Sequence, residues 1–383
     1  MANANQVSLG RINLSTGTGY DGATDKYALY LKLFSGEMFK GFQHETIARD
    51  LVTKRTLKNG KSLQFIYTGR MTSSFHTPGT PILGNADKAP PVAEKTIVMD
   101  DLLISSAFVY DLDETLAHYE LRGEISKKIG YALAEKYDRL IFRSIARGAR
   151  QASPVSATDF AEPGGTQIRV GSTTNDSDAY NATNLINAFY DAAAAMDEKG
   201  VSSAGRCAVL NPRQYYSLIQ NVGSNGLVNR DVQGSALQSG NGVIEIAGIH
   251  IYKSMNIPFL GNYGVAYGGT TGETSPGNLG DFIAQTDKTK PGGFEDASAA
   301  TSGINNDYGT DTEFGAKSCG LIFQKEAAGV VEAIGPQVQV TNGDVSVIYQ
   351  GDVILGRMAM GADYLNPAAA VELYVGGTAP SAF

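Results

Sequence analysis

The chain has 383 residues, of which 42% are hydrophobic and 18% are charged, and its formal net charge is −8. These values are typical of a globular protein with two or three domains, and the acidic balance argues against a chain that coats nucleic acid. No apolar run approaches the roughly 18 residues of a membrane span, and residues 1–10 lack the basic and apolar regions of a signal peptide.

The first 47 residues predict an arm rather than a self-contained domain. Residues 1–24 are polar and rich in glycine, threonine and asparagine, which indicates an extended or disordered segment. Residues 25–47 predict a helix with a bulky apolar face that includes Tyr27, Leu31 and Phe34. No partner element follows, so this face must pack on a distant segment or on another chain.

Residues 54–110 predict a very long hairpin. Alternating apolar residues at Leu63, Phe65 and Tyr67 indicate one strand, and further strands are expected at 95–99 and 102–110. The intervening residues 70–91 are rich in proline and glycine, and such long connections are usually functional. Because an isolated hairpin is only marginally stable in water, we expect it to lie on a neighbouring subunit.

One long amphipathic helix is predicted over residues 111–147. Asp111 and Glu114 form a capping-box pattern at its start, and no proline interrupts it. At 1.5 Å per residue the helix would be roughly 50 Å long, which suits a spine in a large assembly. Its apolar stripe, mostly at a spacing of four, comprises Leu112, Leu116, Tyr119, Leu121, Ile125, Ile129, Leu133, Tyr137, Ile141 and Ile145.

The remainder alternates between regular elements and polar loops. Helices are predicted at 179–199 and 213–221, the second begun by Asn211 and Pro212. Residues 222–242 and 259–316 are glycine-rich, the latter an insertion with a short strand at 282–284. Further strands are predicted at 206–210, at 243–253 as a pair around Gly248, and at 319–324, 333–340, 345–355, 358–364 and 371–375.

Glycine-rich motifs in this chain favour turns over phosphate sites. Residues 17–22 match G-x-G-x-x-G, but a polar tail precedes them where a strand is required, so a flexible linker is the better interpretation. The sequence at 59–62, Asn-Gly-Lys-Ser, resembles the end of a phosphate loop, but Arg55 stands in place of the first glycine. Asn59 and Gly60 therefore predict a hairpin turn.

No set of residues has the spacing of a catalytic, cofactor-binding or metal site, and we predict none. His44, His76, His118 and His250 are far apart, and the only cysteines, Cys207 and Cys319, are expected to be reduced. Carboxylates near the predicted spine, at 100–101 and 111–114, are explained by the helix dipole. The cluster at Asn306, Asp307, Asp311 and Glu313 lacks the spacing of a calcium loop.

Two basic clusters interrupt the acidic chain, at residues 54–61 and along the predicted spine. The second contains Arg139, Arg143, Arg147 and Arg150. Our main interpretation is a solvated helix face that complements the negative helix C-terminus, and the alternative is a contact with an acidic partner surface.

Several blocks of sequence, in order, resemble the major capsid protein of short-tailed phages of the T-seven type, which has an HK97-like fold. The resemblance points to cyanophage members of that group. It is carried well by residues 25–147 and less strongly by 317–375, whereas the insertion at 259–316 departs from the family pattern. The matching blocks are residues 25–37, 61–70, 94–103 and 109–111, then His118, Tyr119 and Arg122, and finally 358–362 with the run to Leu373.

The resemblance implies an α+β chain with an N-terminal arm, an extended β-hairpin loop, a long spine helix and a mixed α/β axial domain. The implied arm is residues 1–50 and the extended loop 51–98. The implied peripheral domain is 99–178 with the spine at about 111–147, the axial domain is 179–340, and the C-terminal strands at 341–383 return to the peripheral domain.

The implied function is a non-enzymatic major capsid protein without cofactors. Copies would self-assemble into hexamers and pentamers of an icosahedral virion shell, built in the host cytoplasm on a scaffolding protein and with a portal at one vertex. The shell would enclose double-stranded DNA without binding it specifically and would need no membrane. The alternative is another self-assembling structural subunit, such as a tail, sheath or surface-layer protein.

Overall fold

The computed structural model divides the chain into two compact units, which comprise Met1–Thr46, Asp101–Tyr137 and Ala333–Met360 in unit 1, and Ile47–Asp100, Asp138–Glu332 and Gly361–Phe383 in unit 2. Within them, the structure describes residues 46–69, 71, 73, 75–79, 92–99, 102–110, 121–154, 162–173, 176–220, 244–254, 256–257, 318–340, 348, 350–377 and 379.

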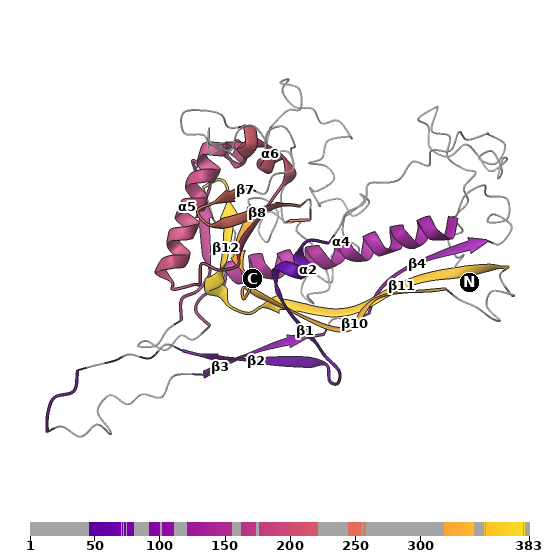
Figure 1. Ribbon diagram of the computed structural model, residues 1–383, viewed down its shortest axis with the longest axis horizontal. Coiled ribbons are helices and arrows are strands. Elements are labelled where there is room, and N and C mark those ends of the chain that lie inside the picture. Colours follow the sequence, from indigo (N-terminus) through magenta and orange to yellow (C-terminus); the bar gives the residue numbers. More distant parts are fainter. Residues whose placement is uncertain are drawn as a thin grey trace. The chain divides into compact units, whose positions relative to one another are not determined.

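A long helix, α4, spans Leu121–Ala149 and has 29 residues (Figure 1). At 1.5 Å per residue it is roughly 44 Å long. It confirms the predicted spine and continues two residues further, while residues 111–120, including the predicted cap, lie outside the described residues. The predicted apolar stripe is buried at Ile129, Leu133, Tyr137, Ile141 and Ile145.

In unit 1, the first part of α4 packs on two antiparallel strands, β4 (Leu103–Tyr110) and β11 (Gly351–Tyr364). The core consists of Ile129 and Leu133 from the helix with Val109 and Ile354 from the strands. Gly356 permits this close approach, because a Cβ atom at that position would lie 2.3 Å from Cγ2 of Ile129. A single missing side chain thus sets the distance between helix and sheet.

In unit 2, β2 (Ser62–Thr68) and β3 (Val92–Val98) form an antiparallel two-stranded sheet (Figure 1). This pairing confirms the predicted hairpin, but the hairpin is shorter than the predicted 54–110. The third predicted strand, β4, pairs with β11 instead, because its alternating apolar residues form the core beneath α4.

The hairpin turn predicted at Asn59 and Gly60 is wrong, and these residues form a bend instead. Gly60 has a φ of +99°, which glycine adopts without strain. The bend joins β2 to β1 (Thr53–Thr56), and β1 pairs in parallel with β10 (Ala328–Val340), not with β2. Asn-Gly therefore reverses the chain between two different sheets here, whereas the sequence pattern alone favoured paired neighbours. The four-stranded sheet has the order β1-β10-β11-β4.

Unit 2 also contains a mixed six-stranded sheet with the order β5-β12-β9-β6-β8-β7. The helices α5 (Ala182–Glu198) and α6 (Pro212–Gln220) lie beside it (Figure 1). The 3-10 helix η1 (Asp176–Tyr180) contacts both helices. The strands are β5 (Thr166–Arg169), β6 (Arg206–Leu210), β7 (Ile244–Ile246), β8 (Ile249–Lys253), β9 (Ser318–Gln324) and β12 (Ala370–Tyr374).

Local sequence signals account for the boundaries of these elements. The Asn181 side chain accepts a hydrogen bond from the Thr183 N–H and caps α5, and Asn211 caps α6 through the Arg213 N–H at 3.0 Å. Ala247 and Gly248 both have positive φ, as a tight turn between β7 and β8 requires. These observations confirm the predicted helices and the strand pair around Gly248.

The C-terminal strands are longer than predicted. The runs predicted separately at 345–355 and 358–364 form one strand, β11, because Gly356 lies against the helix instead of breaking the strand. Residues 341–347 lie outside the described part, as do the predicted arm except for Thr46 and Ile47, residues 222–242 and the insertion at 259–316.

We expect Gly356→Ala to destabilise unit 1 by about 1–3 kcal/mol, since the added methyl group would overlap Ile129. Gly335→Ala is the matched control, because a Cβ atom at Gly335 would meet nothing within 4 Å. Thermal unfolding of both variants tests this, and equal melting temperatures would contradict the proposed contact between helix and sheet.

Candidate functional site

The two faces of the β2–β3 hairpin differ in burial. On the inner face, Leu63 and Phe65 pack against a core formed by Ile97, Val331 and Leu365. On the outer face, Ile66 is 74% exposed and Val92 is 65% exposed, and Val98 is also exposed. Large apolar side chains gathered on one exposed face are typical of a contact surface for another molecule.

The hairpin also offers open strand edges. Among the described residues, β2 and β3 pair only with each other. Unpaired edges leave backbone N–H and C=O groups available to another chain, and a lone hairpin is marginally stable unless something covers it. Met71 and Phe75, in the segment beyond β2, are exposed as well. Both features favour a hairpin that completes its packing on a second molecule.

Polar contacts fix the hairpin to the end of β11. The Lys95 ammonium lies 2.8 Å from Oδ2 of Asp363 and 3.6 Å from the centre of the Tyr364 ring. The Tyr67 hydroxyl donates a hydrogen bond to the carbonyl of Leu365. Consecutive residues 363–365 thus hold both strands of the hairpin, so its direction is set by the chain itself.

Burial raises the pKa of the Tyr67 hydroxyl above its ordinary value of 10.0, and the negative charges of Glu326 and Glu162 raise it further. The neutral phenol is the form that can donate to Leu365. This contact is therefore intact at neutral pH.

The segment that leads away from the predicted N-terminal arm is also held by carboxylates. The buried Asp138 of α4 accepts hydrogen bonds from the backbone N–H groups of Ile47 and Ala48, at 3.0 and 3.2 Å. Glu332, buried on β10, pairs with Arg49 at 3.2 Å and with Lys54 at 2.8 Å. Residues 47–54 therefore have a defined path on the chain's own core.

The arginine row on α4 is mostly buried. Arg139, Arg143 and Arg150 are each 7% exposed, so the solvated-face interpretation is wrong for these three, while Arg147 is exposed. Arg150 pairs with the buried Glu372 of β12 through hydrogen bonds of 2.6 and 2.8 Å. The acidic partner is in this case the chain's own last strand, which sequence spacing could not reveal.

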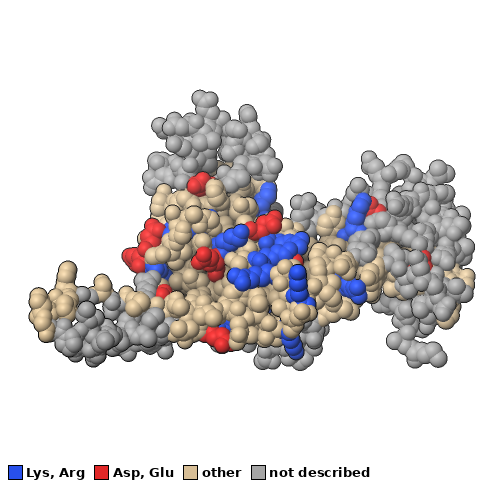
Figure 2. All heavy atoms as spheres, turned by 60° about the horizontal axis from the view of Figure 1, so that its bottom comes forward, with Lys and Arg blue, Asp and Glu red and all other residues tan. Residues whose placement is uncertain are grey.

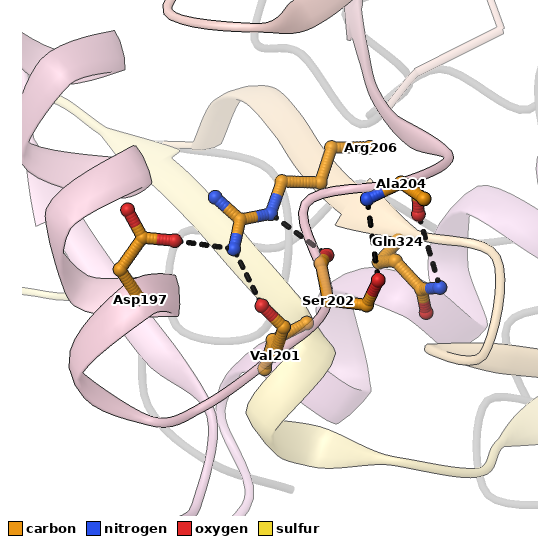
Figure 3. A network of polar contacts seen from close by, with 6 residues as sticks. All are labelled: Asp197, Val201, Ser202, Ala204, Arg206 and Gln324. Atoms are coloured by element: carbon orange, nitrogen blue, oxygen red, sulfur yellow. Dashed lines mark hydrogen bonds and ion pairs between the residues drawn. The ribbon is translucent and has the colours of Figure 1, made fainter.

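A second polar network joins the end of α5 to the start of β6 (Figure 3). The Arg206 guanidinium contacts Asp197 at 2.6 Å and donates to the carbonyls of Val201 and Ser202, while Gln324 donates to the carbonyl of Ala204. Most of these acceptors are backbone carbonyls. The arrangement braces a loop, and it resembles a structural junction more than a reaction centre.

The two cysteines are buried thiols on β6 and β9. Burial raises the pKa of Cys207 to about 12 and raises that of Cys319 as well, so neither is a reactive thiolate at neutral pH. His250 lies 3.7 Å from Glu245 in an exposed position. Within the described ranges, no group of three histidine, cysteine, aspartate or glutamate residues is placed to hold a metal ion.

Several residues that the sequence singled out lie outside the described residues. These are the Gly17–Gly22 motif, His44, His118, the carboxylates at 100–101 and 111–114, and the cluster at Asn306, Asp307, Asp311 and Glu313. Among the helices that the structure describes, none is both long and apolar enough to cross a membrane. Uncharged residues make up most of the described surface in Figure 2, with lysine and arginine in a few groups.

The fold is that of phage capsid proteins with the HK97-like architecture. The alignment with the capsid structure of cyanophage P-SCSP1u covers 98% of this chain and 100% of the cyanophage chain, with a TM-score of 0.67 and 31% sequence identity. The alignment with the mature capsid of bacteriophage PhiM1 covers 91% of this chain and 93% of the PhiM1 chain, with a TM-score of 0.60 and 16% sequence identity. The α+β fold class predicted from the sequence is therefore confirmed.

The chain belongs to the Gp10A-like major capsid protein family, whose model matches residues 64–290. The major capsid protein of Escherichia phage T7 is 25% identical over 368 residues, which are 94% of this chain and 95% of that protein. That of Enterobacteria phage T3 is 32% identical over 136 residues, 36% of this chain and 39% of that protein. The predicted family and the role of phage major capsid protein are both confirmed.

We expect the stability of the hairpin contact to fall as the pH rises above 10. Because the folded pKa of Tyr67 lies above its ordinary value of 10.0, the folded chain retains a proton that the unfolded chain loses. The loss is at most about 1.4 kcal/mol per pH unit, and partial exposure of the ring reduces it. Urea unfolding at several alkaline pH values measures it. Tyr67→Phe should show a shallower decline, and identical pH slopes for the two proteins would contradict the assignment.

Proposed function

We propose that the chain self-assembles into the hexamers and pentamers of an icosahedral phage head that encloses double-stranded DNA. The observation that carries the proposal is the hairpin, whose apolar outer face is exposed while Tyr67 and Lys95 fix it to the chain's own core. A surface that is held in a defined direction and left uncovered on its own chain suits a contact with a sister copy.

The parts of the chain take the roles that the family resemblance implies. In this proposal residues 1–50 are the N-terminal arm, 51–98 the extended loop and 99–178 the peripheral domain. Residues 179–340 are the axial domain, which includes the insertion at 259–316, and 341–383 return to the peripheral domain. The anchors at Asp138 and Glu332 hold residues 47–54 on the chain's own core, which supports an arm whose last residues are fixed there.

The proposed partners are a scaffolding protein during assembly in the host cytoplasm and a portal at one vertex. Packaged DNA is enclosed without specific binding, which the net charge of −8 supports. The role is structural, without catalysis or cofactor. Many modest contacts repeated over neighbouring copies give a stable shell without tight pairwise binding.

Electron microscopy of the protein co-expressed with its scaffolding protein tests the proposal. We expect closed polyhedral particles. Tubes or flat sheets would favour a sheath or surface-layer subunit, and small discrete oligomers would contradict a shell protein altogether.

We expect Ile66→Ser to weaken assembly while leaving the fold intact, since Ile66 is mostly exposed in the subunit and buried in the proposed contact. Loss of about 1.5–3 kcal/mol per contact would raise the concentration needed for assembly by about ten- to a hundredfold. Thr68→Ser, an exposed position on the same face of the same strand, is the control. Light scattering against protein concentration measures both, and equal thresholds would argue against an apolar contact at the hairpin.

A further inference from the structure

The unit 1 sheet has a second face, opposite α4, that carries both apolar and basic side chains. Ile354 and Gly356 of β11 face the helix. Because side chains alternate between the two faces along a strand, Leu355 and Arg357 point away from the helix. In the register of the sheet, Arg357 lies opposite Ile104 of β4. Ile104 is 53% exposed, which leaves an apolar side chain next to a guanidinium on this face.

Arg357 has a buried donor without an acceptor. Its Nε atom is buried and has no hydrogen-bond partner, and the side chain forms no ion pair within the part of the chain that the structure describes. As a whole the Arg357 side chain is only partly buried, so a counter-charge on another molecule can approach the guanidinium. The face is therefore incomplete on this chain alone, and the group that completes it should carry negative charge.

The outer face of the hairpin has the complementary chemistry. Glu94 of β3 lies opposite Ile66 of β2, with Val92 and Val98 on the same face. Oε1 of Glu94 accepts hydrogen bonds from the side chains of Gln64 and Thr96, which fix the carboxylate in place. Among the described residues Glu94 forms no ion pair, so Oε2 is available to a guanidinium.

We propose that Glu94 of one copy pairs with Arg357 of a neighbouring copy, and that Ile66 and Ile104 pack beside this ion pair. The inference rests on the proposed function, which supplies the neighbouring copy, and it names the surface that receives the hairpin. Each face contributes an apolar residue and one charge, and the charges are opposite. A buried charge pair of this kind selects orientation and register between copies.

Charge reversal tests the pair. Glu94→Arg and Arg357→Glu, each alone, place like charges together, so each should raise the concentration needed for assembly by about a hundredfold. The double variant Glu94→Arg/Arg357→Glu should assemble again. An equimolar mixture of the two single variants should also assemble into rings with an even number of copies, because alternate copies then present opposite charges at every contact.

The mixture separates a contact between copies from one within a copy. If the double variant assembles and the mixture does not, the pair lies within one chain and the proposal is wrong. Single variants that assemble like the wild type would also overturn it, as would a double variant that does not recover. If the wild type itself forms no particles, the proposed function fails instead, and that outcome is distinct from these.

Two controls separate loss of contact from loss of folding. Arg169→Glu reverses an exposed arginine on β5, in the six-stranded sheet, and should leave assembly unchanged. If Arg357→Glu does not fold, as judged by its melting temperature, Arg357→Met keeps the aliphatic stem and removes the charge. Assembly should then be weakened by Arg357→Met and not weakened further by adding Glu94→Gln, whereas additive losses would overturn the pairing.

Discussion

A two-stranded sheet can bury one face on its own chain only if the other face is left to water or to another molecule. In this protein the inner face of the hairpin packs in a core with Ile97, Val331 and Leu365. The outer face exposes Ile66, Val92 and Val98. The exposed face follows from the strand alternation itself, because every second residue must point outwards. The apolar face that we propose a second copy covers is therefore a consequence of how few strands the hairpin has.

The charged contacts at Asp138, Glu332 and Lys95, which are buried or partly buried, contribute more to geometry than to stability. Asp138 accepts two backbone N–H groups, Glu332 pairs with two cations, and Lys95 contacts both Asp363 and Tyr364. Buried ion pairs contribute little net stability compared with apolar packing, but their geometry is specific. They hold residues 47–54 and the hairpin in defined positions on the chain's own core.

The regular elements could be predicted from the sequence because local signals determine them. The stripe on α4, the Asn caps of α5 and α6 and the turn at Ala247 and Gly248 all depend on neighbouring residues. Pairing between distant strands could not be predicted, so β4 was assigned to the hairpin although it pairs with β11. The burial of the arginine row cannot be predicted for the same reason, since Glu372 lies 222 residues from Arg150.

The candidate contact residues show a further limit of sequence reasoning. Nothing local distinguishes Arg357 from an ordinary strand arginine, because its significance depends on an acceptor that the described chain does not supply. Glu94 is equally unremarkable until its register opposite Ile66 is known. When the partner of a residue belongs to another copy, the single subunit shows a polar group without a hydrogen-bond or ion-pair partner next to exposed apolar side chains. In a self-assembling protein, such polar groups and apolar side chains determine the position and orientation in which the next copy can bind.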